Sequence, residues 1–248
     1  MKPSDDILGG LCITMPCFNE AEGLEGFIEE LFSELDIYLV KIIIVNDNST
    51  DDTLFVINKL LSRFPKVICH TNKVNLGHGP SSVIGMRLAL ETQSEYILTI
   101  DGDGQFLPLE IKEFLRNESL SDFEVLEGVR KKRKDPYFRK IVTFLLRVMV
   151  YFSTKKFPSD ANTPLRLYHR NTLEKLLTSI DPSSPTPNLR ISILSRKLNL
   201  KIRQREFTSV VRRGHSQTGT TWRSKRDYLP SKRFLSFCFR AALKLLRN

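Results

Sequence analysis

The stretch YILTIDGDGQFLP, residues 96–108, ends an apolar run with two aspartates separated by one glycine. On an extended chain, side chains two residues apart point to the same side, so Asp101 and Asp103 are expected to present their carboxylates together. Two neighbouring carboxylates repel each other, and a shared cation relieves that repulsion. Oxygen ligands favour a hard divalent ion such as Mg2+ or Mn2+. The pattern therefore predicts either a metal site or a solvated turn, for which Asp and Gly are common residues.

The composition is that of a soluble globular protein. The chain has 248 residues, of which 41% are hydrophobic and 27% are charged, and this length suffices to bury a substantial core. Its four cysteines show no paired metal-ligand spacing, which favours a reduced, cytosolic protein. We expect no signal peptide and no membrane span, because no apolar stretch reaches the roughly 20 residues that a span needs.

The charge is distributed very unevenly. Residues 1–129 hold 9 Lys and Arg against 22 Asp and Glu, whereas residues 130–248 hold 29 against 6. The net charges of the two parts are therefore −13 and +23. A half that basic predicts an anionic partner: phosphate groups, a membrane surface or nucleic acid.

The first half alternates short apolar strands with amphipathic helices. We predict strands at residues 11–16, 41–47, 66–71 and 95–101, and helices at residues 22–35, 49–64 and 79–93. This order predicts an α/β fold with a mostly parallel sheet and helices on both faces. In such sheets ligands bind beyond the carboxyl ends of the strands, where Asp47 and Asp101 are expected. Two acids at two strand ends favour a functional site over two unrelated turns.

The second half is less regular. We predict a strand at 124–130, a helix at 136–153, a loop at 181–188 and a helix at 231–248. The helix at 136–153 is too short and too charged to span a bilayer, which suits a buried or interfacial position. The tail helix is basic and amphipathic, and it is expected either to lie on an anionic membrane or to pack on the domain.

Four motifs in the first half carry a family resemblance. They are MPCFNEAEGL (15–24), VNDNSTDDT (45–53), NLGHGPSSVIGM (75–86) and DGDGQFLP (101–108). Each motif is weak alone, but their types and their order together resemble the family 2 glycosyltransferases. In the second half, SDANTPLRLYHR (159–170) and VRRGHS (211–216) resemble segments of the dolichol- and polyprenyl-phosphate sugar transferases.

The resemblance implies a GT-A fold, which is Rossmann-like, and a glycosyltransferase domain over residues 1–216. Its nucleotide-sugar and metal half is expected at 1–129, its acceptor half at 130–216, and the basic amphipathic tail at 217–248. The implied activity is inverting, metal-dependent transfer of a sugar from a nucleotide-sugar donor to a polyprenyl phosphate. The alternative is a glycosyltransferase that extends a cell-surface polysaccharide or glycolipid. The enzyme is expected to be cytoplasmic and to bind peripherally to the inner face of an anionic membrane.

The resemblance also implies roles for individual residues. The metal ligands would be Asp101, Asp103 and Gln105, and the catalytic residues Asp103 and Asp160. The nucleotide would be bound by Pro16, Phe18, Glu20, Asp47 and Asp101, and the acceptor or its phosphate by Arg166, Arg212, Arg213 and Ser216. Each arginine has the alternative of being a surface charge, and Phe18 that of being ordinary core.

This sequence departs from the family pattern at several positions. Asn46 and Asn48 replace the first acid and the glycine of the second motif, and Pro164, Leu165 and Gln217 are unusual in the acceptor segments. These departures leave the metal residues untouched but weaken any assignment of the sugar and the acceptor.

Other functions explain less of the sequence. DGDGQ also resembles the nucleophile loop of aspartate-based phosphatases, but that loop normally lies near the N-terminus, and Gln105 stands at its Thr position. A calcium loop fails because Phe106 and Lys112 occupy the positions that require Gly and Glu. A nucleic-acid-binding module would account for the basic half but not for the acids at the strand ends, so no nucleic-acid partner is expected.

Overall fold

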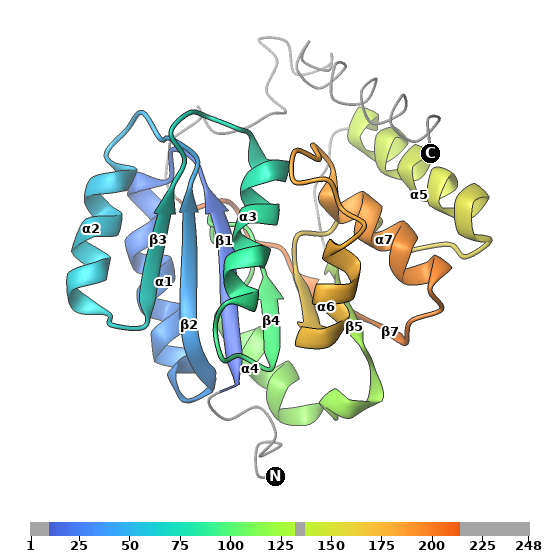
Figure 1. The fold of residues 1–248 in the computed structure, drawn as a ribbon, viewed down its shortest axis with the longest axis horizontal. Helices are drawn as coiled ribbons and strands as arrows, with labels where there is room; N and C mark the ends of the chain where they lie inside the picture. The colour runs from blue at the N-terminus through green and yellow to red at the C-terminus, as the bar shows by residue number, and fades with distance from the viewer. Residues whose placement is uncertain (1–9, 132–136, 214–248) are drawn as a thin grey trace.

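The computed structural model describes residues 10–131 and 137–213 (Figure 1). Within that part of the chain, the strands are β1 (Leu11–Cys17), β2 (Leu39–Asn46), β3 (Val67–Thr71), β4 (Tyr96–Thr99), β5 (Val125–Lys131), β6 (Arg166–His169) and β7 (Ile202–Thr208). The α-helices are α1 (Ala21–Leu35), α2 (Thr53–Arg63), α3 (His78–Leu90), α4 (Pro108–Asn117), α5 (Tyr137–Thr154), α6 (Arg170–Leu177) and α7 (Pro187–Lys197). Two short 3-10 helices, η2 (Asp36–Tyr38) and η3 (Leu120–Asp122), precede β2 and β5.

The strands form a single mixed sheet in the order β3-β2-β1-β4-β6-β5-β7. Strands β3, β2, β1 and β4 are mutually parallel, and β7 is parallel to β5. Strand β6 alone runs against its neighbours β4 and β5. The predicted α/β fold with a mostly parallel sheet is therefore confirmed.

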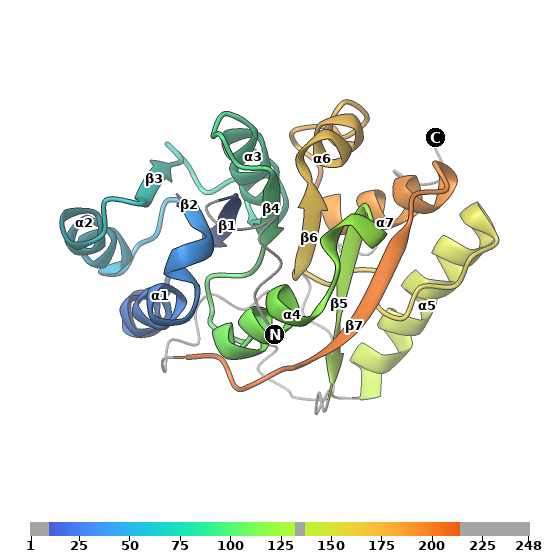
Figure 2. The same cartoon turned by 90° about the horizontal axis from the view of Figure 1, so that it is seen from below.

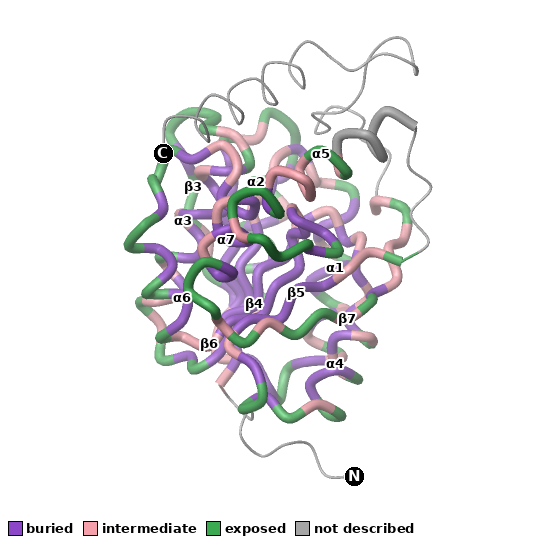
Figure 3. Tube along the Cα trace, turned by 90° about the vertical axis from the view of Figure 1, so that its right-hand side faces the viewer, coloured by how far each residue is buried: buried purple, intermediate pink, exposed green. Residues whose placement is uncertain are grey.

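Helices cover both faces of the sheet because the central strands direct apolar side chains to both of its sides. In β2, Ile42 and Ile44 pack into the cluster of α1, α2 and α4, while Ile43 and Val45 pack into the cluster of α3, α6 and α7. Figure 2 shows these two groups of helices on opposite faces of the sheet. All four side chains are completely buried, and the strands form the buried centre of the molecule in Figure 3. The resulting layers hold the carboxyl ends of β1, β2 and β4 at one edge.

Helix α5 lies apart from these two layers, at the outer edge of the molecule beyond α7 (Figures 1 and 2). A small separate core attaches it, in which Val150 and the partly buried Leu146 pack against Ala161, Leu189 and Ile193. The helix predicted at 136–153 is thus confirmed. In the ranges that the structure covers, we find no helix with the length and apolarity needed to traverse a bilayer.

The strands and helices predicted in the first half are all present, with ends that differ by a few residues, and so is the strand predicted at 124–130. The sequence did not predict α4, β6, α6, α7 or β7, and α7 begins within the predicted loop at 181–188. The tail helix predicted at 231–248 lies outside the described residues. The proposed division at residues 129 and 216 remains a prediction.

Candidate active site

Two aspartates follow β4, as predicted, but the chain carries them in a turn. Strand β4 ends at Thr99, and residues 102 and 103 form the turn, so the expectation of an extended segment through Asp103 was wrong. Both side chains are partly buried. Burial and then the charge of Asp101 raise the pKa of Asp103 to about 7. The predicted repulsion between the carboxylates is therefore present in a turn that is not freely solvated.

His78 is a site residue that the sequence analysis did not identify. It is the first residue of α3, and its Nε2 lies 2.7 Å from Oδ1 of Asp101. Desolvation opposes protonation of the imidazole, but the carboxylates of Asp101, Asp103 and Asp47 together outweigh it and hold the pKa of His78 above its usual value. The imidazole thus orients Asp101 towards the end of α3. The only signal in the sequence that could have identified His78 was its position inside the third motif, and Asp101 lies 23 residues further along the chain.

Asp47 organises the loop that delivers His78. Its carboxylate accepts hydrogen bonds from the backbone N–H of Leu76 and Gly77 and from the side-chain amide of Asn72, each at 2.8 Å. Gly77 has a φ of +92°, a conformation that a side chain would strain. Asp47 is only 3% exposed. The predicted contact of Asp47 with the nucleotide remains a prediction, and the observed contacts give the residue a structural role as well.

Substitution of Asp47 is expected to loosen this loop. Asp47→Ala leaves three donors without their acceptor, and each such loss in a buried site costs about 1–3 kcal/mol. We expect a loss of at least about 2 kcal/mol in the free energy of unfolding and roughly tenfold weaker binding of a nucleoside diphosphate. Urea denaturation and titration calorimetry measure the two effects. The exposed neighbour Asp52 provides the control: Asp52→Ala should change neither, and an Asp47→Ala protein with wild-type values would contradict the role.

Residues 209–213, which we call the C-terminal strap, lie along the loop that carries the aspartates. The backbone N–H of Val210 donates to the carbonyl of Gln105 at 3.0 Å, and that of Arg213 donates to the carbonyl of Asp103 at 3.0 Å. The Gln105 side chain donates to the carbonyl of Val210 at 3.4 Å. Gly104 has a φ of +66°, and a Cβ there would lie 2.6 Å from Arg213. The strap therefore holds the loop that carries Asp103 and Gln105 in place.

Both arginines of the strap are engaged with carboxylates. Arg212 binds both oxygens of Glu20, at 2.6 and 3.1 Å. Arg213 pairs with Glu30, and its guanidinium lies 5.2 Å from the ring centre of Phe27. Burial raises the pKa of Glu20 to about 7, although Arg212 opposes the shift. The phosphate-binding roles of both arginines remain predictions, and Ser216 lies outside the described residues.

A second pair of charges lies in the part of the chain that was predicted to bind the acceptor. Asp160 is 8% exposed, and its Oδ2 accepts hydrogen bonds from Nη2 and Nε of Arg130 at 2.9 and 3.1 Å. In the sequence, Arg130 was assigned only as the last residue of the strand predicted at 124–130. Its position near the end of a predicted strand, as at Asp47 and Asp101, was the signal that could have identified it.

The predicted phosphate contact of Arg166 does not fit the structure. Arg166 is completely buried. Its guanidinium donates to the carbonyls of Asn188 and Ala161, at 2.7 and 3.3 Å, and lies 3.6 Å from Glu127. A phosphate has no open surface at which to reach it. Arg166 instead ties the loop of Asp160 to the start of α7.

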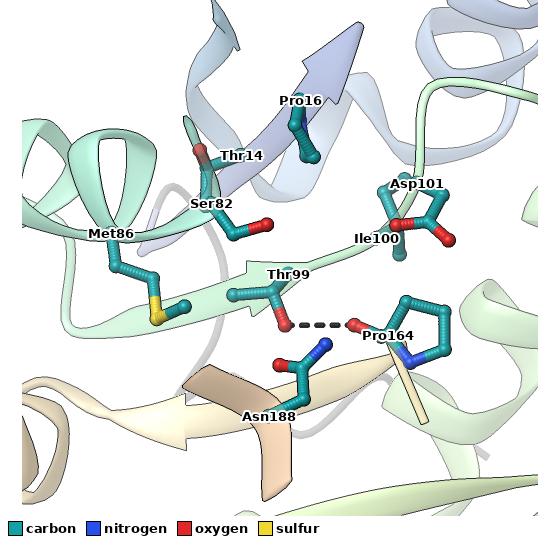
Figure 4. A pocket seen from close by; sticks show the side chains of 9 residues that line it. All are labelled: Thr14, Pro16, Ser82, Met86, Thr99, Ile100, Asp101, Pro164 and Asn188. Carbon is teal, nitrogen blue, oxygen red and sulfur yellow. Dashed lines mark hydrogen bonds between the residues drawn. The ribbon is translucent and has the colours of Figure 1, made fainter. Parts of the chain in front are cut away.

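A pocket lies where the two halves meet. Its lining comprises Thr14, Pro16, Ser82, Met86, Thr99, Ile100, Asp101, Pro164 and Asn188 (Figure 4). The hydroxyl of Thr99 donates to the carbonyl of Pro164 at 2.9 Å, which joins β4 to the loop before β6. Pro16 and Asp101 thus share one pocket with Pro164 and Asn188 from the second half of the chain. Phe18 and Glu20 follow Pro16 closely in the sequence, and both are half-buried. Their contacts with the nucleotide remain predictions.

The carboxylates of Asp101 and Asp103 suit a divalent ion that is held partly by the protein and partly by the substrate. Among the described residues, no group of three or more His, Cys, Asp and Glu side chains is arranged to hold a metal alone. Mg2+ is commonly held by one or two carboxylates together with substrate phosphates and water. Asp101 and Asp103 match that arrangement, because they are oxygen donors with a repulsion that a cation would relieve.

A mostly parallel sheet with acids beyond its central strands defines a class of α/β proteins that bind ligands at that edge. The model of the family described as "Glycosyl transferase family 2" matches residues 12–177. The chain belongs to this family.

Undecaprenyl-phosphate 4-deoxy-4-formamido-L-arabinose transferases are among its relatives. Those of Serratia proteamaculans and Yersinia enterocolitica are 25% and 27% identical over 199 residues, which cover 79% of this chain. The chain spans only 60% of the length of these relatives.

Solved structures share the fold. Mannosyl-3-phosphoglycerate synthase from Rubrobacter xylanophilus superimposes with a TM-score of 0.60 at 14% identity, over 96% of this chain and 74% of its own. A mannosyltransferase from Pyrobaculum calidifontis in complex with GDP-Man and Mn2+ gives 0.56 at 14%, over 96% and 64%. Glucosyl-3-phosphoglycerate synthase from Mycobacterium tuberculosis with Mn2+ and UDP-glucose gives 0.56 at 14%, over 84% and 72%. The fold is thus the predicted GT-A fold.

Proposed function

We propose that the protein transfers a sugar from a nucleotide diphosphate donor to a polyprenyl phosphate, with inversion at the anomeric carbon. The observation that carries the proposal is the pair Asp101 and Asp103 beside a pocket that both halves of the chain line. A donor diphosphate on the aspartates would place its sugar towards the acceptor half. Membership in glycosyltransferase family 2 supports the reaction class.

The residues on the donor side would hold the metal ion and position the donor diphosphate. Asp101 and Asp103 would hold Mg2+ or Mn2+, which neutralises the charge that grows on the departing diphosphate. Structural neighbours that contain Mn2+ with a nucleotide sugar support this cofactor. His78 orients Asp101, and the strap holds the loop of Asp103. Gln105 is proposed as an auxiliary ligand through its amide oxygen.

The acceptor side is proposed to lie at Arg130 and Asp160. An acceptor phosphate is already anionic, so the reaction needs no strong base to deprotonate it. Arg130 would bind that phosphate through charge-assisted hydrogen bonds, and Asp160 would orient the guanidinium that it now holds. The names of the relatives, which are transferases for undecaprenyl phosphate, support a polyprenyl phosphate as acceptor.

The bond changes follow from these positions. A phosphate oxygen of the acceptor attacks the anomeric carbon of the sugar and forms the new C–O bond. The bond between that carbon and the diphosphate oxygen breaks, and the electron pair leaves with the nucleoside diphosphate. Attack from the opposite side to the leaving group inverts the configuration. The proposed location is the cytoplasmic face of a membrane, where a lipid-linked acceptor presents its phosphate.

A matrix of donors and acceptors tests this proposal. The full chain is incubated with each common nucleotide sugar, Mn2+ and either polyprenyl phosphate, 3-phosphoglycerate or an oligosaccharide, and the released nucleoside diphosphate and the glycosylated product are measured. We expect glycosylated polyprenyl phosphate from at least one donor. A product formed only on the oligosaccharide would favour the extension of a cell-surface glycan, and a product on 3-phosphoglycerate alone would exclude a lipid acceptor.

A further inference from the structure

Helix α5 presents an apolar face to solvent. Phe144, Leu145, Tyr151 and Phe152 are 55%, 52%, 43% and 69% exposed, and Phe157, just after the helix, is 48% exposed. These five residues form what we call the α5 outer face. They gather within 14 residues of chain, whereas single exposed apolar residues are normal and scattered. A contiguous apolar patch of this kind marks an interaction surface.

The spacing places the patch along one side of the helix. Phe144 and Tyr151 are seven residues apart, as are Leu145 and Phe152, so each pair lies two turns apart on nearly the same line. The opposite side is also apolar, because Val150 and Leu146 belong to the small core with α7. Packing within the domain therefore accounts for only one of the two apolar sides.

The charges within the segment that carries the α5 outer face all have one sign. Residues 136–159 contain five Lys and Arg and no Asp or Glu. Arg147 lies 4.5 Å from the ring centre of Phe157, and Nζ of Lys155 lies 6.0 and 5.9 Å from the rings of Tyr151 and Phe152. Aromatic and aliphatic side chains flanked by cations are the composition of helices that lie in the plane of an anionic bilayer surface.

The same charges disfavour the other occupants of the face. A symmetric contact between two copies would bring identical cations together. The segment 231–248 carries five Lys and Arg and no acid, so its own charge opposes packing on the α5 outer face. Nucleic acid would match the cations but not the aliphatic and aromatic side chains between them.

We infer that the α5 outer face binds the surface of an anionic lipid bilayer. The aromatic side chains enter the interfacial region, and Arg147 and Lys155 contact anionic head groups. Asp160 follows Phe157 by three residues and pairs with Arg130. Docking on this face therefore brings the charged pair of the acceptor half next to the membrane. The binding itself does not depend on the proposed reaction.

Co-sedimentation with vesicles tests the inference. The full chain is mixed with vesicles of phosphatidylcholine and phosphatidylglycerol, without any polyprenyl phosphate, and the bound fraction is measured at low and high salt. We expect binding at low salt, release as salt rises, and at least about tenfold weaker partitioning for the double variant Phe144→Ser, Phe152→Ser. Lys155→Glu should weaken binding to anionic vesicles as well.

Two controls decide what the result means. Phe55 is 71% exposed on α2, at the opposite edge of the molecule from α5 in Figure 1, and Phe55→Ser should leave binding unchanged. The triple variant Phe234→Ser, Phe237→Ser, Phe239→Ser tests the tail in the full chain. Unchanged binding of the α5 double variant would overturn the inference, whether the tail variant loses binding or not. A dimer in sedimentation analysis that the α5 double variant dissociates would assign the face to a second copy instead.

Discussion

Asp101→Asn and Asp103→Asn are each expected to abolish sugar transfer while leaving the protein folded. Lewis-acid stabilisation of a departing diphosphate is worth several kcal/mol, so the expected loss in rate is roughly a thousandfold or more. Chelation with EDTA should stop the wild-type enzyme, and Mn2+ or Mg2+ should restore it. The measurement is glycosylated product formed per unit time, with thermal unfolding as a check on the fold.

The matched control is Asp122→Asn. Asp122 is an exposed aspartate in η3, and the same change there should leave the rate unaltered. Full activity in chelator, or in either site variant, would remove the metal from the proposed function. A loss of activity accompanied by unfolding would instead give the aspartates a structural role.

The second large effect is expected at Glu127, a residue of β5 whose buried side chain contacts Arg166 of β6 and Arg196 of α7. It is completely buried and accepts hydrogen bonds from Arg196 at 2.7 and 2.9 Å and from Gln204 at 3.1 Å. Arg166 lies 3.6 Å away. Glu127→Ala would leave two buried guanidinium groups without their carboxylate, and breaking a buried pair in this way costs about 3–5 kcal/mol. Urea denaturation gives the change in the free energy of unfolding.

The chain offers a close control for this experiment. Glu118 also binds two arginines, Arg203 and Arg205, but at the surface. Exposed ion pairs contribute about 0–1 kcal/mol, so Glu118→Ala should cost far less than Glu127→Ala. Equal losses for the two variants would contradict the argument from burial.

The stability that Glu127 confers also depends on pH. Burial alone would raise its pKa, but Arg196 and Arg166 outweigh burial and lower the pKa of Glu127 below its ordinary value of 4.5. The folded state therefore favours the ionised carboxylate. This contribution to stability is fully present above about pH 4.5 and is lost as the pH falls towards the lowered pKa.

The first half could be predicted because its signals are local. A strand such as β2 is apolar at consecutive positions, and the helices between the strands show their apolar spacing within a few turns. Asp101 and Asp103 could be predicted for the same reason, since the preceding strand and the two acids occupy one short stretch. The structure ends that strand at Thr99 rather than at Asp101, and the metal-binding role of the two acids remains a prediction.

The second half depends on contacts that a linear pattern does not show. Strand β6 inserts between β4 and β5 against their direction, yet it is four residues long and begins with Arg166. Helix α7 buries the polar residues Asn188, Ser192 and Arg196. Its polar sequence therefore does not show that the helix packs into the interior. The partners of Asp47 and Glu20 lie about 25 and 192 residues away in sequence. Spacing alone therefore could not pair them.

The strap makes the formation of the candidate site depend on the order of synthesis. Asp101 and Asp103 leave the ribosome more than 100 residues before Val210 and Arg213, whose backbone groups bind that loop. This loop is therefore completed only when the last described residues of the chain have been made. A fragment that ends before the strap would contain both aspartates and yet lack the groups that hold their loop in place.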